Sequence, residues 1–281
     1  MRDFLAQVVA WVNIPMNWAG EGILSFIAVM PGWLSNTIIS AVTGVVLLVI
    51  FKYTSNQRAI GRARDEIKAN MLALKLFKDS ISVTLAAEVR IFRGAFLLLV
   101  HSIRPMLVMI VPVCLLLSQL GLWYQKRALL PEEETMVTVT LSARSGEMRP
   151  AVNIEQTGAI EVVSGPVSIL SEREIVWQIK AIKPGISRMS FQVDGQQYDK
   201  EIVVGEGVRR VSARRPGWDW AEMLMNPAEK PFGNGSAVEG ISVDYPARRS
   251  WTSGTDWWVG YFFVASMVFA FIFKPIVKVR I

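Results

Sequence analysis

Three long stretches of the chain carry no Lys, Arg, His, Asp or Glu: residues 22–51, 105–125 and 257–273. A charge at the centre of a bilayer costs roughly 2.5–3.5 kcal/mol, so uncharged runs of this length are typical of helices surrounded by lipid. As one helix the first run would be about 45 Å long, against about 30 Å of hydrocarbon, and Pro31-Gly32 is the expected break. We therefore predict three membrane-spanning helices, at 34–52, 105–125 and 257–275.

The first 33 residues have a different pattern. Phe4, Val8, Trp11 and Val12 fall near one face of a helix. Indole side chains concentrate at the boundary between membrane and water, and Trp18 and Trp33 follow in the same segment. We therefore expect residues 1–33 to form an amphipathic or re-entrant segment at the outer interface.

Between the first two predicted spans, residues 53–104 are basic and helical in pattern. Ile60, Ile67, Leu74 and Ile81 recur every seven residues, which is the spacing of a helix packed against another helix. Lys78-Asp79-Ser80 is the expected turn into a second helix. The pattern predicts a helical hairpin. The alternative is that residues 91–104 extend the second span outward as one long helix.

From Thr135 onward the hydrophobic period changes from that of a helix to two residues. TMVTVTLSA alternates apolar and polar positions, and four similar runs follow before residue 205. Asp194-Gly195 is a strong hairpin signal between two of these runs. We predict an all-β sandwich at 126–205, with Trp177 in its core. An irregular connection is expected at 206–256, with one short helix in GWDWAEMLM.

The charge distribution gives the expected orientation. Residues 52–104 hold ten Lys or Arg and four Asp or Glu, in a chain of net charge +6. Because Lys and Arg concentrate on the cytoplasmic side of membrane spans, the hairpin and a tail at 276–281 are predicted to lie in the cytoplasm. The N-terminus and residues 126–256 are then outside. We expect a multi-pass protein of the cell membrane, inner or plasma, whose basic residues contact anionic lipid of the inner leaflet and not DNA.

Few residues are available for catalysis. His101 is the only histidine and Cys114 the only cysteine, which excludes a metal site built on histidines, a Ser/His triad and an intrachain disulfide. The sequence contains no phosphate-binding loop and no dinucleotide-binding glycine pattern. We expect no enzymatic activity, no cofactor, no metal and no small-molecule substrate. Glu132-Glu133-Glu134 is expected to be a solvated loop rather than a cation site.

The first predicted span carries a polar stripe. Asn36, Ser40 and Thr43 are spaced i, i+4 and i+7, and so share one face of a helix. Such a stripe either packs against neighbouring helices or lines a hydrated groove, which would lower the cost of moving polar chain into the bilayer. The candidate groove residues are Asn36, Thr37, Ser40, Thr43, Ser118 and Gln119.

Basic and methionine side chains of the hairpin and the second span are candidate contacts for a client protein, a ribosome or lipid. Cations suit anionic partners, and flexible methionine side chains suit apolar partners of variable shape. These candidates are Arg58, Arg62, Arg64, Lys68, Arg90, Arg93, Arg104, Met71, Met106 and Met109.

The order of parts resembles the YidC/Oxa/Alb insertase superfamily, nearest its short branch of archaeal and ER-membrane-complex insertase subunits. The resemblance covers about residues 34–125 and is carried by FKYTSNQRAIGRARDEIKANMLALKLFK and RPMLVMIVPVCLLLSQLGLWY. It implies a membrane protein insertase or chaperone, which offers a polar groove and a basic cytoplasmic hairpin to nascent membrane segments. The competing hypothesis is a non-catalytic scaffold or assembly subunit of a membrane complex, which binds partners through its β-sandwich and its hairpin.

Overall fold

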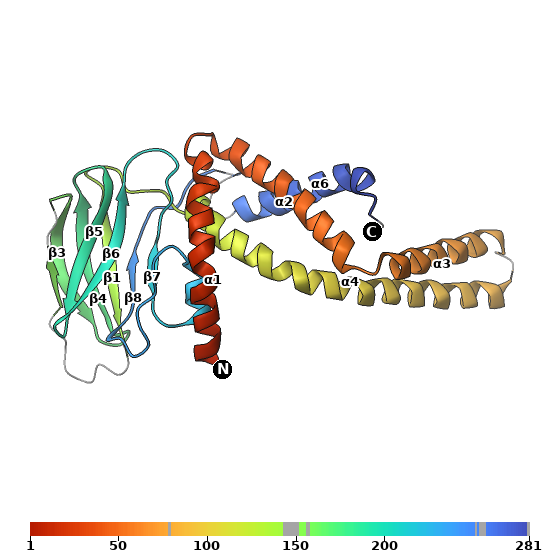
Figure 1. Cartoon of the computed structure of the whole chain (residues 1–281), viewed down its shortest axis with the longest axis horizontal. Helices are drawn as coiled ribbons and strands as arrows, with labels where there is room; N and C mark the ends of the chain where they lie inside the picture. Colours follow the sequence, from red (N-terminus) through yellow and green to blue (C-terminus); the bar gives the residue numbers. More distant parts are fainter. Residues whose placement is uncertain (78–79, 143–151, 156–157, 251, 253–256, 280–281) are drawn as a thin grey trace. The chain divides into compact units, whose positions relative to one another are not determined.

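The computed structural model (Figure 1) describes the whole chain except residues 78–79, 143–151, 156–157, 251, 253–256 and 280–281. The chain divides into two compact units. Unit 1 comprises Met1–Asn36 and Leu115–Tyr261, and unit 2 comprises Thr37–Cys114 and Phe262–Ile281.

Four helices cover most of the three uncharged runs and of the basic region between the first two, although residues 22–31 of the first run precede α2. Three of them, α2, α4 and α6, are long and apolar enough to cross a membrane, as the uncharged runs predicted. The bounds are α2 (Gly32–Thr54), α3 (Gln57–Leu76), α4 (Ile81–Tyr124) and α6 (Trp258–Val277). Helix α4 has 44 residues and is both the second apolar helix and the second helix of the hairpin. Residues 91–104 therefore belong to the hairpin and also extend the second apolar helix, as one continuous helix.

Helices α3 and α4 lie side by side as a hairpin in unit 2 (Figure 1). At Gly94 an added Cβ would lie 2.7 Å from Cγ1 of Ile67, so a glycine allows the two helices to approach closely. Ile60 and Ala87 are buried, but Ile81 is 77% exposed because it opens α4 and does not continue the repeat of α3. The predicted turn at Lys78-Asp79 lies outside the described residues.

Two antiparallel sheets lie between α4 and α6 in the chain, which confirms the predicted β region. Trp177 is buried, and its ring centroid lies 5.7 Å from that of Phe191 in the other sheet, so both sheets contribute to one apolar core. One sheet has the order β3-β4-β1-β8-β7 and the other β2-β5-β6. The bounds are β1 (Glu134–Leu141), β2 (Val152–Glu155), β3 (Ile160–Ile169), β4 (Glu174–Ala181), β5 (Gly185–Val193), β6 (Gln196–Val204), β7 (Arg214–Pro216) and β8 (Val238–Val243).

Residues 206–256, expected to be irregular, contain two of these strands. β8 lies between β1 and β7, and Val139 of β1 pairs with Ile241. The short run around Gly240 is a strand because of this distant pairing, which no local pattern reveals. The short helix expected nearby is α5 (Trp220–Met225), whose first backbone N–H groups donate to the side chain of Asp219.

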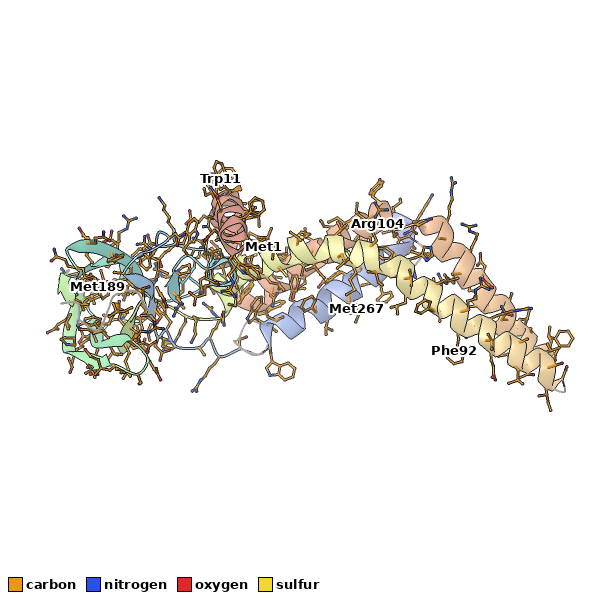
Figure 2. All side chains as sticks on the ribbon, turned by 90° about the horizontal axis from the view of Figure 1, so that it is seen from below. Met1, Trp11, Phe92, Arg104, Met189 and Met267 are labelled. Carbon is orange, nitrogen blue, oxygen red and sulfur yellow. The ribbon has the colours of Figure 1, made fainter. Side chains whose placement is uncertain are left out.

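The N-terminal segment is mostly one helix, α1 (Arg2–Gly22), followed by a short 3-10 helix, η1 (Leu24–Ala28). One side of α1 packs against α5, where Nδ2 of Asn13 donates to the carbonyl of Met223 at 2.9 Å. Phe4, Trp11 and Trp18 are exposed, and Trp11 projects from the helix in Figure 2. One side of α1 therefore lies against α5, and exposed apolar side chains lie elsewhere on the helix. The two sheets, α5 and the segments that join them are called the β domain below.

Candidate functional site

The polar stripe of α2 is buried. The side chains of Asn36, Ser40 and Thr43 are enclosed by protein, and Thr37 is half-buried. In unit 1, Nδ2 of Asn36 donates to the carbonyl of Thr252 and, at 3.4 Å, to that of Trp258 in the first turn of α6. The amide therefore binds backbone where α6 begins.

In unit 2 the same face of α2 packs directly on α6. A Cβ added at Gly44 would lie 2.3 Å from the carbonyl oxygen of Ser266, so the two backbones are in contact there. Ser40 precedes Gly44 by four residues, a spacing of small residues that lets membrane helices approach closely. At the other end, Nζ of Lys52 donates to the carbonyl of Val277 at 2.8 Å. The stripe thus belongs to a helix–helix contact.

The two candidates on α4 have other partners. The hydroxyl of Ser118 donates to the carbonyl of Leu115 in its own helix at 2.8 Å. Gln119 is buried, and its Nε2 donates to Oδ1 of Asn17 in α1 at 2.9 Å. Gln119 therefore fastens the end of α4 to the N-terminal helix.

Arg210, which the sequence analysis did not single out, completes this attachment. Its guanidinium donates to Oε1 of Glu21 and to Oδ1 of Asn17, both at 2.9 Å. Burial lowers the pKa of Arg210 from its ordinary value, and the carboxylate of Glu21 opposes that shift. Glu21 is the only charged residue between Asp3 and Lys52. This isolated charge in an apolar region was a sequence signal that Glu21 has a structural role. It could not identify Arg210, which lies 189 residues away, as the partner.

A buried ion pair lies inside the β domain. Nζ of Lys200 is fully enclosed, pairs with Glu229 and donates to the carbonyls of Ser212 at 2.7 Å and Glu201 at 3.0 Å. Burial lowers the pKa of Lys200, and Glu229 opposes the shift. Because all three donor positions of the ammonium are used and enclosed, this lysine fixes the chain after β6 and is not placed to act on a substrate.

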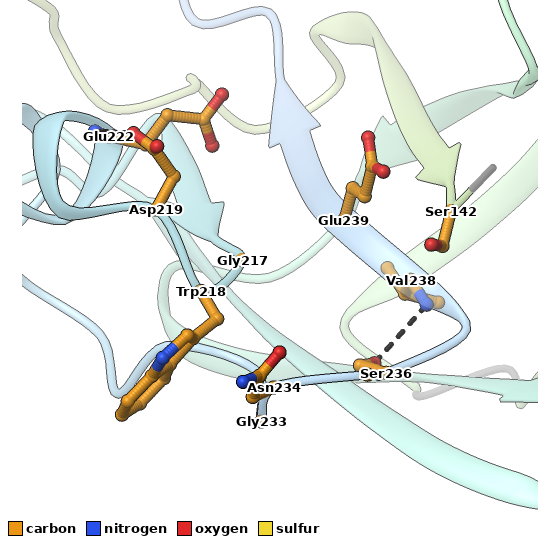
Figure 3. A pocket seen from close by; sticks show the side chains of 11 residues that line it. Ser142, Gly217, Trp218, Asp219, Glu222, Gly233, Asn234, Ser236, Val238 and Glu239 are labelled. Atoms are coloured by element: carbon orange, nitrogen blue, oxygen red, sulfur yellow. Dashed lines mark hydrogen bonds between the residues drawn. The ribbon is translucent and has the colours of Figure 1, made fainter. Parts of the chain in front are cut away.

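A hollow of about 360 Å³ in the β domain has Asp219, Glu222 and Glu239 in its lining, with Glu239 on β8 and the other two at the start of α5 (Figure 3). Asp219 accepts from the first backbone N–H groups of α5 at 3.0 Å, and Glu222 pairs with Arg214 at 3.2 Å. Asp219 and Glu222 therefore have local structural partners. In the described part of the chain, no group of three His, Cys, Asp or Glu side chains is placed to hold a metal ion.

The acidic run before β1 is divided among different partners. Glu132 pairs with Lys180, Glu133 with Arg127 and Glu134 with the amide of Gln178. The Arg127 guanidinium lowers the pKa of Glu133. The three carboxylates do not converge, so their arrangement is that of a loop tied to its neighbours.

A larger hollow of about 730 Å³ lies between α1 and the β domain. It is lined mainly by apolar side chains, among them Trp11, Ile14 and Phe232. Arg215 lies at its side, with the guanidinium 4.3 Å from the centroid of the Phe232 ring and hydrogen-bonded to backbone carbonyls of Asp199 and Lys230. The guanidinium of Arg215 is thus occupied by contacts within the protein, and the hollow presents apolar surface rather than reactive groups.

The basic and methionine candidates are spread along the hairpin and α4. Most are exposed, and Arg64 and Met109 are half-buried. Nδ1 of His101 lies 2.6 Å from the carbonyl of Leu97 in the same helix, as expected of a histidine on a helix face. The exposed members are Arg58, Arg62, Lys68, Met71, Arg90, Arg93, Arg104 and Met106.

In comparisons with known proteins, no family model, curated protein or solved structure matched this chain. The resemblance to insertases therefore stays a hypothesis. Function has to be inferred from the contacts of the chain itself.

Proposed function

We propose that this protein is a membrane-embedded assembly subunit without enzymatic activity. It crosses the membrane through α2, α4 and α6 and binds partner proteins through a β-sandwich on one side and the hairpin of α3 and α4 on the other. The single observation that carries this proposal is the burial of the α2 polar stripe. In this stripe Asn36 binds the segment that leads into α6, and Gly44 packs against α6 itself.

The physical argument concerns the cost of polar groups in hydrocarbon. An amide in the bilayer needs a hydrogen-bond partner, and helix association supplies one. Asn36 has carbonyl partners at Thr252 and Trp258, and small residues bring two backbones together at Gly44. This arrangement supports a packed bundle in preference to a hydrated groove.

Orientation follows from the charges. One span separates the hairpin from the β domain in the chain, so the two lie on opposite sides of the membrane. The excess of Lys and Arg in residues 52–104 favours the cytoplasm of the cell for the hairpin, where basic side chains also meet anionic lipid. The β-sandwich and α1 are then outside, with the indoles of Trp11 and Trp18 at the membrane interface.

An insertase-like activity is the second candidate, and one observation favours it. Met71 and Met106 are exposed on the hairpin and on α4, among basic side chains such as Lys68 and Arg104. Flexible thioethers accept apolar partners of variable shape, as a protein that receives nascent membrane segments would require. In that case Ser40 and Thr43 would have to meet water and client during insertion.

Thiol accessibility separates the two candidates. In a Cys114→Ala background, Ser40→Cys and Thr43→Cys would be treated in isolated membranes with a water-soluble maleimide, which reacts with a thiolate only where water is present. Ser82→Cys, on the exposed hairpin, is the reactive control, and Val46→Cys, on the exposed apolar face of α2, is the unreactive one. A packed stripe predicts that both test cysteines react as slowly as Val46→Cys. Reaction at the rate of Ser82→Cys would contradict the proposal.

A photo-crosslinker at Ser40 provides an independent measurement. An assembly subunit should crosslink within its own helices and not to nascent membrane segments held on ribosomes. Crosslinks from position 40 to such segments, with none from position 46, would establish the insertase candidate instead.

A further inference from the structure

Helix α4 carries two apolar stripes, and only one of them packs against α3. Buried Ala87 and Gly94 lie on the face that contacts Ile67 of α3. At about 100° per residue, the second stripe is centred roughly 170° away around the helix. Figure 2 shows Phe92 of this stripe projecting away from α3. We call it the α4 seam; it consists of Leu85, Val89, Phe92, Phe96, Leu99 and Ile103, all exposed.

The α4 seam follows a heptad repeat outside the predicted span. Val89, Phe92 and Phe96 are 67%, 76% and 65% exposed, far more than ordinary helix packing leaves. Successive seam residues are separated by alternating steps of four and three, which places three at heptad position a and three at position d. Val89 and Ile103 at a, with Leu85 and Leu99 at d, match the preference of parallel two-stranded coiled coils.

The charged residues beside the seam are also complementary in a parallel two-stranded coiled coil. Glu88 occupies position g and Arg93 position e of the next heptad. In a parallel pair, a g side chain faces the e side chain five residues further along the other helix. Glu88 of one copy would therefore lie opposite Arg93 of the other, twice by symmetry. Of the four remaining flanking residues, Ala86, Ala95 and Ser102 are small and allow close approach, and the fourth, Val100, is apolar and exposed.

The geometry points to a second copy of this chain as the occupant of the α4 seam, in a parallel, two-fold symmetric dimer. The inference rests on the proposed membrane orientation. Copies inserted the same way are related by an axis along the membrane normal, so their α4 helices run parallel, as the pairing of Glu88 with Arg93 requires. Two-fold dimers are also the commonest symmetric assembly. The hairpin contact with α3 is undisturbed, because it uses the other side of α4.

Cysteine crosslinking of the full-length protein in isolated membranes tests the dimer. In the Cys114→Ala background, Val89→Cys, Phe92→Cys and Leu99→Cys lie on the seam, and Arg90→Cys is an exposed control outside it. Two copies with tags of different mass would be co-expressed and oxidised. The dimer predicts crosslinks between the two tagged copies from the seam positions, at least about fivefold more than from Arg90→Cys, since seam residues at a and d face their own counterparts.

A charge exchange distinguishes a specific dimer from general stickiness of an apolar face. Glu88→Arg should lower crosslinking from Leu99→Cys roughly three- to tenfold, because two attractions become two repulsions. Arg93→Glu should do the same. The double variant Glu88→Arg/Arg93→Glu should restore crosslinking to within about twofold, since opposite charges again face each other.

Equal crosslinking at the seam and at Arg90→Cys would overturn the inference and leave lipid as the cover of the seam. A crosslinked product whose mass is not that of two tagged copies would show that a different protein, and not a second copy of this chain, occupies the seam. Failure of the charge exchange to restore crosslinking would exclude the parallel register. None of these outcomes alters the reactivity of Ser40→Cys and Thr43→Cys, so failure of the dimer and failure of the proposed function are distinguishable.

Discussion

A substitution of the buried amide of Asn36 tests whether the α2 stripe is packed or lines a hydrated groove. Asn36→Leu removes the donor to the carbonyls of Thr252 and Trp258 and should lower stability by about 1–3 kcal/mol, the usual cost of leaving a buried polar group without its partner. Thermal unfolding in detergent would measure the change. Val42→Leu, on the exposed face of α2, is the matched control. A hydrated groove makes the opposite prediction, because leucine in a polar groove would stabilise the protein in detergent.

The pair of Lys200 and Glu229 gives a prediction for the β domain. Glu229→Gln leaves a buried ammonium without its counter-charge, which should destabilise the domain by about 3–5 kcal/mol. Burial already lowers the pKa of Lys200, and loss of Glu229 should lower it further. The unfolded state then binds a proton that the folded state releases, so the stability of the variant should rise with pH as the unfolded pKa near 10.5 is approached.

Chemical unfolding of the full-length protein in detergent, followed by tryptophan fluorescence at several pH values, would test this prediction. The exposed pair of Arg188 and Glu201 is the matched comparison, and Arg188→Gln should change stability by less than about 1 kcal/mol. Equal effects of Glu229→Gln and Arg188→Gln would show that burial of the lysine contributes little.

At the scale of elements, the contact of α2 with α6 depends on one glycine. Gly44→Leu would place side-chain atoms where the carbonyl of Ser266 lies, and backbone cannot move aside as a flexible side chain can. We expect at least about 1–3 kcal/mol of destabilisation and faster maleimide labelling of Thr43→Cys in the same protein. Val46→Leu is the control. Unchanged labelling in Gly44→Leu would show that α6 is not what shields the stripe.

Sequence patterns predicted elements better than their contacts. The uncharged runs located α2, α4 and α6, and the two-residue period located β1 and β4, because these signals depend on the solvent around each segment. The pairing of β8 with β1 and the attachment of Glu21 to Arg210 were not predictable, because each joins residues far apart in the chain. The α2 stripe was recognised, but the choice between groove and packing required the position of α6.

For the whole molecule, the orientation of the chain is the first property to measure. In a Cys114→Ala background, Gln192→Cys of the β domain should react with an impermeant maleimide in intact cells. Ser82→Cys of the hairpin should react only after permeabilisation. Both residues are exposed, so a difference in labelling reports the side of the membrane. The reverse pattern would contradict the topology and, with it, the cytoplasmic dimer.

The place of β8 in the sheet has a consequence for biosynthesis. Thr138 pairs with Ser242, so β1 has a free edge until the ribosome has added about 100 residues, which takes roughly 5–20 s at ordinary rates of translation. An unpaired edge strand is a template for aggregation. Because α6 follows soon after β8, the sheet closes at nearly the moment the last long apolar helix is made. During that interval β1 depends on protection by chaperones or by the chain itself.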